Sequence, residues 1–230
     1  MQVIILAGGF GTRLQEVVKD VPKPMAMINN KPFLEYLFLY LSRYNIKDVI
    51  LSVSYKKDII INHFKNKYKN INIIYSIEKT PLGTGGAIMQ AFSYVDSNKA
   101  LVVNGDTFFN LNLDLFIKNN TKKNFDIILS LKEMENFDRY GSVKVNKDEV
   151  IAFEEKKFYN KAYINCGTYL IDKRIFNNMK DINTFSFESF LETNLSTLNV
   201  YSYISNNSYF IDIGIPSDYE KVKIEFKEEF

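Results

Sequence analysis

Two stretches near the amino terminus combine glycines with cationic side chains, and this combination suits phosphate binding. The first is Gly8-Gly9-Phe10-Gly11-Thr12-Arg13, directly after the apolar run Val3 to Ala7, and the second is Pro22-Lys23-Pro24. Glycines after a buried strand let backbone amides approach phosphate oxygens closely. Arg13 offers a planar fork for a pyrophosphate, and Lys23 offers a compact charge between two prolines. These residues predict a nucleotide site.

Two other phosphate-binding motifs fit this stretch poorly. Gly9-x-Gly11 begins a dinucleotide-binding fingerprint, but its third glycine is missing because position 14 is leucine. The P-loop pattern also fails, since no Gly-Lys-Ser/Thr stands at the required offset. The remaining alternative is a structural glycine turn with both cations incidental.

Two aspartates follow runs that are typical of strands. Asp106 comes after Lys99 to Asn104, and Asp212 lies in Tyr209 to Ile213. Carboxylates from distant parts of the sequence could meet at one hard cation, and Mg²⁺ commonly takes one or two carboxylates together with substrate phosphates. The alternative is that each aspartate caps a turn or helix.

The pattern along the chain predicts an α/β fold. In the first half, strands alternate with helical stretches, which implies a parallel sheet with helices on both faces. Ligands in such sheets bind at the carboxyl ends of the strands. The expected strands are 3–7, 48–54, 72–76, 99–104, 126–131, 141–145, 150–154, 162–171, 200–205 and 209–213. The expected helices are 33–44, 56–68, 85–94 and 217–230.

Composition excludes several classes of protein. The 230 residues carry 29 basic and 27 acidic side chains, without the basic excess of a nucleic-acid binder. The single cysteine, Cys166, cannot form an intramolecular disulfide. No apolar run is long enough to span a bilayer, so we expect a cytoplasmic protein without a membrane partner.

The motifs together resemble the sugar-1-phosphate nucleotidyltransferases. Gly8 to Leu14 with Pro22-Lys23-Pro24 is similar to the family signature. The other matching motifs, in the family's order, are Leu82-Gly83-Thr84-Gly85-Gly86-Ala87, Asn104-Gly105-Asp106, Tyr140-Gly141, Glu154-Glu155-Lys156, Asn165-Cys166-Gly167 and Ile211-Asp212-Ile213-Gly214. The resemblance implies one α/β domain over 1–230, with a Rossmann-like, mostly parallel central sheet flanked by helices in a GT-A-like arrangement. A nucleotide-binding half (about 1–110) would precede a smaller, strand-rich, sugar-binding and dimer-facing half (about 111–230).

The resemblance also implies roles for individual residues. Arg13, Lys23 and Lys156 would be catalytic, and Asp106 and Asp212 would hold Mg²⁺. The implied nucleotide-binding set is Leu6, Ala7, Gly8, Gly9, Gly11, Thr12, Arg13, Glu78, Gly83, Thr84, Gly85 and Asp106. The implied sugar-phosphate set is Gly141, Glu155, Lys156, Asn165 and Asp212. For Glu155 and Lys156 the alternative is a solvated charge run. A homodimer is a possible assembly.

The position of Glu78 indicates which nucleotide base the protein binds. It precedes the second glycine loop, in the segment that resembles the family's base-recognition loop. Guanine presents two adjacent donors that a carboxylate can accept together, whereas uracil and thymine present one donor flanked by acceptors. We therefore expect GTP, with UTP or dTTP as alternatives; a solvent-facing Glu78 is the other interpretation.

Overall resemblance favours D-glycero-α-D-manno-heptose 1-phosphate as the sugar, for surface polysaccharide synthesis, and mannose 1-phosphate is the alternative. Tyr140, Ser142 and Tyr163 are candidates for contact with the exocyclic tail.

Two functions from other classes stay open. One is a catalytically silent, regulatory relative that only binds a nucleotide sugar. Such a protein could dispense with Arg13, Lys23 or a metal-binding aspartate, and the presence of all of them disfavours it. A glycosyltransferase would carry an Asp-x-Asp motif, whereas Asn104-Gly105-Asp106 has one carboxylate. His63 is predicted to be a surface residue without a catalytic role, and Cys166 a small packed side chain.

Overall fold

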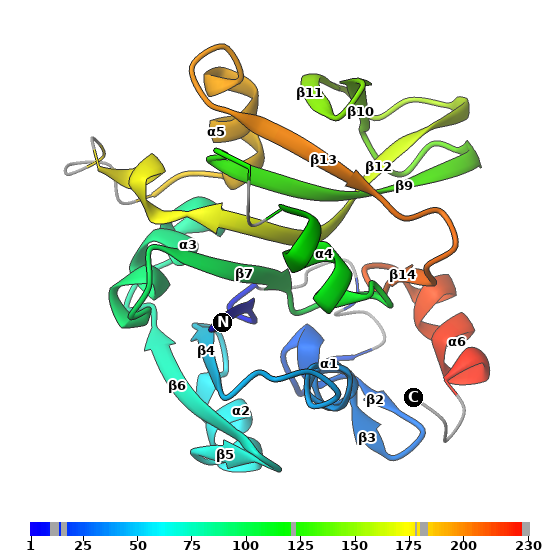
Figure 1. Cartoon of the computed structure of the whole chain (residues 1–230). Coiled ribbons are helices and arrows are strands. Elements are labelled where there is room, and N and C mark those ends of the chain that lie inside the picture. Colours follow the sequence, from blue (N-terminus) through cyan, green and yellow to red (C-terminus); the bar gives the residue numbers. More distant parts are fainter. Residues whose placement is uncertain (10–13, 15–17, 121–122, 178, 180–183, 227–230) are drawn as a thin grey trace.

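A ten-stranded mixed β-sheet runs through the computed structural model (Figure 1), which describes residues 1–9, 14, 18–120, 123–177, 179 and 184–226. Its strands lie in the order β10-β11-β13-β9-β12-β7-β1-β4-β6-β5. Their bounds are β1 (Val3–Leu6), β4 (Asp48–Val53), β5 (Lys67–Tyr68), β6 (Ile71–Ile77), β7 (Lys99–Asn104), β9 (Ile127–Phe137), β10 (Ser142–Asn146), β11 (Glu149–Glu154), β12 (Tyr159–Asp172) and β13 (Val200–Ile204). Two small sheets pair β2 (Met27–Ile28) with β3 (Lys31–Pro32), and β8 (Thr107–Phe109) with β14 (Phe210–Asp212).

The helices of the described residues surround this sheet. They are α1 (Phe33–Leu41), α2 (Lys57–Phe64), α3 (Gly83–Ala91), α4 (Leu113–Asn120), α5 (Phe187–Asn194) and α6 (Pro216–Glu225), with short 3₁₀ helices η1 (Lys23–Met25), η2 (Phe92–Tyr94) and η3 (Lys173–Phe176). α6 begins with a proline, which suits the first helical position because its missing N–H has no partner there.

The sheet has two parts that differ in strand direction. β7, β1, β4 and β6 are parallel neighbours. β12 then pairs antiparallel with β7 and with β9, and so joins the expected amino-terminal and carboxy-terminal halves in one sheet. The expectation of a mostly parallel sheet therefore describes the first half, whereas the sheet as a whole is mixed.

Successive side chains of the central strands face opposite sides, and each side has its own core. Val3 and Ile5 pack in a cluster with residues of α1, α2, α4 and α6. Ile4, between them, packs in a second cluster with residues of α3 and α5. Because a strand alternates its faces, the uninterrupted apolar run of β1 is explained by burial on both sides.

The small β8–β14 sheet places two distant aspartates side by side. Asp212 is opposite Thr107 in this pair, and Thr107 directly follows Asp106. The backbone N–H of Ile213 donates to the carbonyl of Asp106 over 3.1 Å. Residues more than one hundred positions apart are thus fixed at one point by backbone hydrogen bonds.

The structure corrects several expected elements. The helix expected over 56–68 ends at Phe64, because Lys65 adopts a φ of 54°, and the chain reverses into β5. Sequence reasoning missed α4, α5, β2, β3, β5 and β8. The final helix ends at Glu225 rather than Phe230; residues 227–230 lie outside the described residues.

Candidate active site

The candidate site lies along the carboxyl ends of the parallel strands β1, β4, β6 and β7. Three pockets follow one another there. The first and second share Leu6, Gly9 and Thr84, and the second contains Lys23, which bonds to Asp212 of the third. The pockets therefore form one extended groove, at the sheet edge where α/β proteins commonly bind ligands.

The first pocket is an apolar slot with a carboxylate on its wall. It has an empty volume of about 530 Å³ and is lined by Leu6, Gly8, Gly9, Ser52, Glu78, Pro81, Gly83, Thr84 and Ala87. Glu78 is fixed from two sides, since Ser52 Oγ donates to its Oε1 over 3.3 Å and the Leu82 N–H to its Oε2 over 3.2 Å. Burial raises the pKa of Glu78, although these two donors act in the opposite direction. Glu78 thus lies in a pocket that could hold a flat heterocycle.

Gly8 lies so close to Glu78 that a larger residue would have to displace the end of the Glu78 side chain. A Cβ built on Gly8 would lie 2.5 Å from Glu78 Oε1, which is closer than real side chains approach. A Cβ on Gly9 meets no described atom within 4 Å, so Gly9 faces open space in the groove. Ala7 is buried, and its N–H donates to the Ser52 carbonyl over 2.8 Å. Gly11, Thr12 and Arg13 lie outside the described residues, and their roles stay predictions.

The second glycine loop is tied to the start of α5. Gly83 has a φ of +70°, a conformation that favours glycine, and a Cβ on Gly85 would lie 2.1 Å from the Phe185 ring. Thr84 Oγ1 donates to Glu188 Oε2 over 3.0 Å and accepts from the Phe187 N–H over 2.8 Å. Gly83 and Gly85, at the start of α3, therefore allow close contact with Phe185, which lies just before α5. Thr84 and Glu188 line the groove.

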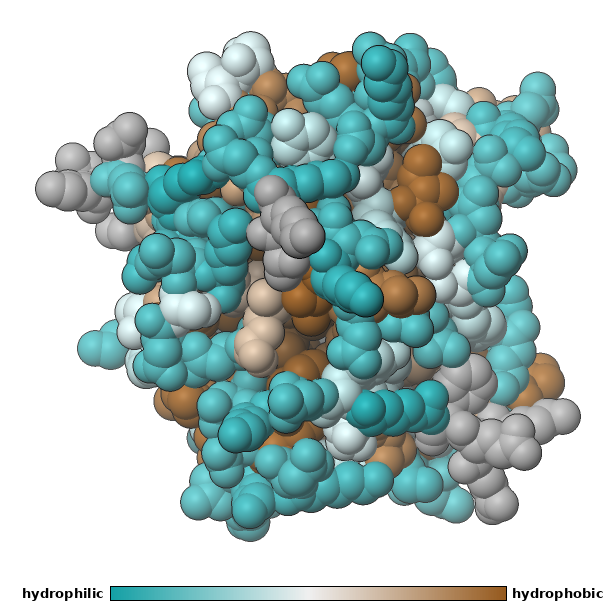
Figure 2. Space-filling model, in the orientation of Figure 1, coloured by the Kyte–Doolittle hydropathy of each residue, from teal (hydrophilic) through white to brown (hydrophobic). Residues whose placement is uncertain are grey.

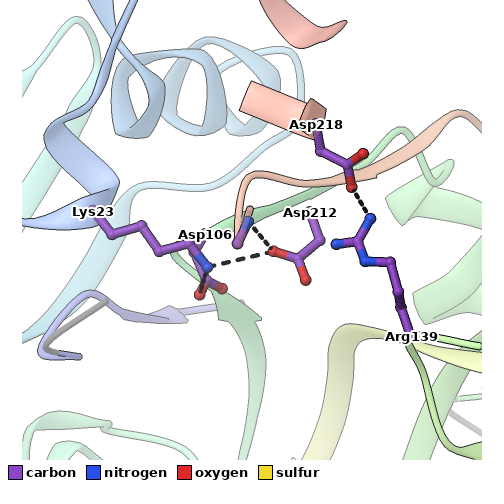
Figure 3. Close-up of polar contacts among 6 residues, drawn as sticks. Lys23, Asp106, Arg139, Asp212 and Asp218 are labelled. Atoms are coloured by element: carbon purple, nitrogen blue, oxygen red, sulfur yellow. Dashed lines mark hydrogen bonds and ion pairs between the residues drawn. The ribbon is translucent and has the colours of Figure 1, made fainter. Parts of the chain in front are cut away.

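The second pocket centres on an ion-pair cluster that Figure 3 shows. Lys23 Nζ lies 2.7 Å from Asp106 Oδ2 and 3.4 Å from Asp212 Oδ1. The Gly214 N–H donates to the same Asp212 oxygen over 2.7 Å. The side chains of Lys23, Asp106 and Asp212 are 11%, 38% and 23% exposed, so the cluster is open mainly through Asp106.

The charges in this cluster perturb one another. Burial alone would lower the pKa of Lys23, but Asp106 and Asp212 outweigh it and the net shift is upward. Burial raises the pKa of Asp212, and the charge of Asp106 adds to that, against the opposing effect of Lys23. Two carboxylates near one point thus require a cation between them, and Lys23 supplies it here.

This arrangement fits a magnesium ion. The Lys23 ammonium group marks a cation position that Asp106 and Asp212 both face. Among the described residues, no three His, Cys, Asp or Glu side chains are grouped to hold a metal on their own. Two carboxylates with the remaining ligands from water and phosphates is a common donor set for Mg²⁺.

The third pocket carries cations on the far side of Asp212. It is lined by Asp138, Arg139, Tyr140, Lys156, Asp212, Gly214 and Ile215 and has an empty volume of about 840 Å³. Lys156 is exposed on the loop after β11. Lys156 thus places an exposed cation in the pocket that Asp212 also lines, and such a cation suits phosphate binding.

Other predicted sugar residues lie outside the lining of these three pockets. Glu155 is exposed beside Lys156, and its backbone carbonyl accepts from the Tyr159 hydroxyl. Asn165 donates to the Tyr169 hydroxyl over 2.8 Å and accepts from the Gly167 N–H. A Cβ on Gly141 would meet the Glu154 carbonyl at 2.6 Å, which explains the glycine without a ligand.

Of the three candidates for contact with the exocyclic tail of the sugar, only Tyr140 is among the residues that line the third pocket. Ser142 is buried and donates to Glu154 over 2.8 Å, and Tyr163 lies opposite Val143 in the β10–β12 pair.

Sequence reasoning missed three residues that line or border the groove. Glu188 lies in the first turn of α5 and bonds to Thr84, and Arg139 pairs with Asp218 near Asp212. Arg139 directly precedes the Tyr140-Gly141 motif, and this position in the sequence could have indicated that it lies near the site.

The structure places the two residues that were predicted to have no catalytic role, Cys166 and His63, outside the lining of the three pockets. Cys166 is fully buried, and burial raises its pKa. His63 lies on α2, and its Nε2 is 3.3 Å from Glu35 Oε2 of α1. Neither residue lines the groove.

The fold and the groove belong to a known class of enzyme. Residues 2–229 match the nucleotidyl transferase family, so the chain belongs to that family. The resemblance drawn from the motifs is thereby confirmed.

Individual relatives match nearly the whole chain. It is 52% identical to D-glycero-alpha-D-manno-heptose 1-phosphate guanylyltransferase of Campylobacter jejuni, covering 95% of this chain and 97% of that one. It is 46% identical to the Aneurinibacillus thermoaerophilus protein of the same name, covering 99% of both chains. The crystal structure of HddC from Yersinia pseudotuberculosis is similar, with a TM-score of 0.88 and 40% identity over 98% of this chain and 99% of that one. A structure of the same protein complexed with GMP-PN gives a TM-score of 0.86.

The face shown in Figure 2 is mainly hydrophilic, with separate hydrophobic patches. No helix in the described part of the chain is long and apolar enough to cross a membrane.

Proposed function

We propose that this protein transfers GMP from GTP to D-glycero-α-D-manno-heptose 1-phosphate, which yields GDP-heptose and pyrophosphate. One observation carries the proposal: Lys23, Asp106 and Asp212 meet between a slot with a half-buried carboxylate, Glu78, and a pocket with cations. A nucleotide and a sugar phosphate bound in these two pockets would bring their phosphates to the cluster. The named heptose 1-phosphate guanylyltransferases, at 52% and 46% identity, support the choice of substrates.

In this proposal guanine occupies the first pocket. Its N1–H and N2 amine would donate to the carboxylate of Glu78, which Ser52 and the Leu82 N–H hold in position. The apolar faces of Leu6, Pro81 and Ala87 would contact the ring. Gly9 lines both the first and the second pocket, so the ribose and phosphates would pass it on the way to Asp106.

The reaction is an in-line substitution at the α-phosphorus. An oxygen of the sugar phosphate forms a bond to the α-phosphorus as the bond to the bridging oxygen breaks, and pyrophosphate takes that electron pair. Lys156 would neutralise the incoming phosphate, Lys23 the α-phosphate and Arg13 the departing pyrophosphate. A Mg²⁺ ion held by Asp106 and Asp212 would supply charge neutralisation to the phosphate oxygens of both substrates.

No protein base is needed for this step. Phosphate monoesters have a second pKa of about 6, so the nucleophile is already anionic near neutral pH. Alignment and charge neutralisation are the main catalytic contributions in phosphoryl transfer. A cytoplasmic location, where nucleoside triphosphates and reduced cysteines occur, suits this proposal and the free Cys166.

Pyrophosphate release tests the reaction class and the nucleotide. Purified protein with magnesium is mixed with each of GTP, UTP, dTTP and ATP, in the presence and absence of each sugar 1-phosphate. We expect release only when GTP and a manno-configured sugar phosphate are both present. Release without a sugar phosphate would indicate hydrolysis, and binding without release would indicate a regulatory relative.

Gly8→Ala and Gly9→Ala form a matched pair that tests the nucleotide pocket. The new Cβ at position 8 displaces Glu78, so we expect the preference for GTP over UTP to fall about tenfold. The Cβ at position 9 meets no described atom, so the thermal midpoint should stay at the wild-type value while the KM for GTP rises. An unchanged KM in Gly9→Ala would show that the nucleotide does not approach this backbone.

A further inference from the structure

Arg139 pairs with one carboxylate, Asp218, in a pocket that a second carboxylate, Asp212, also lines. Its Nη1 lies 2.5 Å from Asp218 Oδ2, and the two side chains are 33% and 19% exposed. Arg139 comes from the loop between β9 and β10, whereas Asp218 lies in the first turn of α6. Figure 3 shows the guanidinium group bonded to Asp218, with Asp212 beside it. Both Arg139 and Asp212 line the same pocket.

Asp212 is a carboxylate in the same pocket with which Arg139 could pair if Asp218 were absent. Burial acts to lower the pKa of Arg139, but the hydrogen bond to Asp218 and the charges of Tyr140, Asp218 and Asp212 outweigh it. Asp212 therefore already interacts with this cation through space. Arginine carries five N–H donors on a planar fork, and its pairs with carboxylates are among the stronger interactions in proteins.

An ion pair between Arg139 and Asp212 would compete with the proposed magnesium ion for the Asp212 carboxylate. Asp212 Oδ1 already accepts from Lys23 and the Gly214 N–H. A guanidinium group bound to the remaining oxygen would occupy the coordination position that the proposed magnesium site requires. The pair between Arg139 and Asp212 would therefore weaken metal binding even though both metal ligands are still present.

We propose that Asp218 is a positioning residue that holds Arg139 away from Asp212 and so keeps Asp212 available to magnesium. This inference rests on the proposed function, in which Asp212 is a metal ligand. Arg139, held in this way, leaves its positive charge in the pocket that contains Lys156 without occupying the carboxylate. The ion pair also joins the loop before Tyr140 to the helix that follows Asp212.

The test uses Asp218→Asn, Asp218→Glu, Arg139→Gln and the double variant Arg139→Gln/Asp218→Asn. Mn²⁺ affinity is measured by isothermal titration in the presence of a non-hydrolysable GTP analogue, and the magnesium dependence of kcat is measured separately. Asp218→Asn removes the charge that holds Arg139, so we expect its Mn²⁺ Kd to rise about tenfold. Asp218→Glu should stay within about twofold of wild type, because it keeps the charge.

The double variant is decisive because the two substitutions should not add. Removing the guanidinium group leaves nothing to occupy Asp212, so Arg139→Gln/Asp218→Asn should bind Mn²⁺ about as tightly as wild type. Double-variant affinity as weak as that of Asp218→Asn, with both variants folded by circular dichroism, would overturn the proposal. So would unchanged affinity in Asp218→Asn.

A matched control comes from an ion pair away from the groove. Lys123 and Asp148 lie 2.6 Å apart, and their side chains are 34% and 53% exposed. Asp148→Asn should leave Mn²⁺ affinity at the wild-type value, and an equal loss there would also contradict the proposal. Failure of the proposed function is distinguishable, because it would appear as absent pyrophosphate release in the wild-type protein.

Discussion

Asp106→Asn and Asp212→Asn are each expected to lower kcat by about a thousandfold or more, an effect equivalent to some 4 kcal/mol of transition-state stabilisation. Both carboxylates lie beside the Lys23 ammonium group, at 2.7 Å and 3.4 Å, and in the proposed function both would hold magnesium. An amide of the same shape keeps an oxygen but removes the negative charge that binds a hard cation. The measurement is the rate of pyrophosphate release at saturating substrates across a magnesium titration.

Folding provides the control for these two variants. Asp212→Asn removes a buried charge whose pKa is raised mainly by burial, and this gain offsets part of the lost contact with Lys23. A carboxyl group with a raised pKa in the fold reduces stability where it is ionised, and this loss is relieved as pH falls through the folded pKa. We therefore expect thermal midpoints within a few degrees of wild type. Near-normal turnover at limiting magnesium in either variant would show that the substituted residue is not a ligand.

Glu78→Gln is expected to lower the ratio of kcat/KM for GTP over UTP by about ten- to a hundredfold. The carboxylate in the first pocket offers two acceptor oxygens to the adjacent donors of guanine. Glutamine offers one acceptor and one donor, so an amide would face the guanine amine with a like group. Uracil, with one N3–H beside a carbonyl, accepts the exchange better. Steady-state kinetics with both nucleotides and one sugar phosphate give the ratio.

The pH dependence gives an independent check on Glu78. Because burial raises its pKa, protonation should begin to reduce kcat/KM for GTP at a higher pH than for an exposed glutamate. Glu78→Gln has no such group and should lack this acidic limb, while titration of the sugar phosphate affects both proteins equally. Equal use of GTP and UTP by the wild-type protein, or identical pH profiles for the two proteins, would remove Glu78 from base recognition.

The nucleotide half of the site was predictable because glycines and charged residues there follow strongly apolar strands. Val3 to Leu6 and Lys99 to Asn104 are buried strands whose ends point to Gly8 and Asp106. The sequence predicted that Asp106 and Asp212 lie close together, but it did not show which strands bring them there. Their proximity depends on β8, a strand of three residues that is too short to show a period.

The carboxy-terminal half was less predictable because its side-chain directions depend on irregular features. The β9–β12 register shifts between Asn165 and Tyr169, and Gly167 there has a φ of 71°. Such bulges redirect side chains, and Asn165 accordingly bonds to Tyr169. Arg139 and Asp218 meet only because a loop and a helix separated by 79 positions come together, and polar residues in loops carry no period that would indicate this.

A competition experiment tests the central claim most directly. The purified protein, with magnesium, receives GTP and UTP at equal concentrations together with D-glycero-α-D-manno-heptose 1-phosphate and mannose 1-phosphate at equal concentrations. Mass spectrometry then identifies the nucleotide sugars that form alongside pyrophosphate. We predict GDP-heptose as the main product, with a kcat/KM for the heptose phosphate at least about tenfold above that for mannose 1-phosphate. Predominant GDP-mannose or a UDP-linked sugar, or no nucleotide sugar at all, would contradict the account.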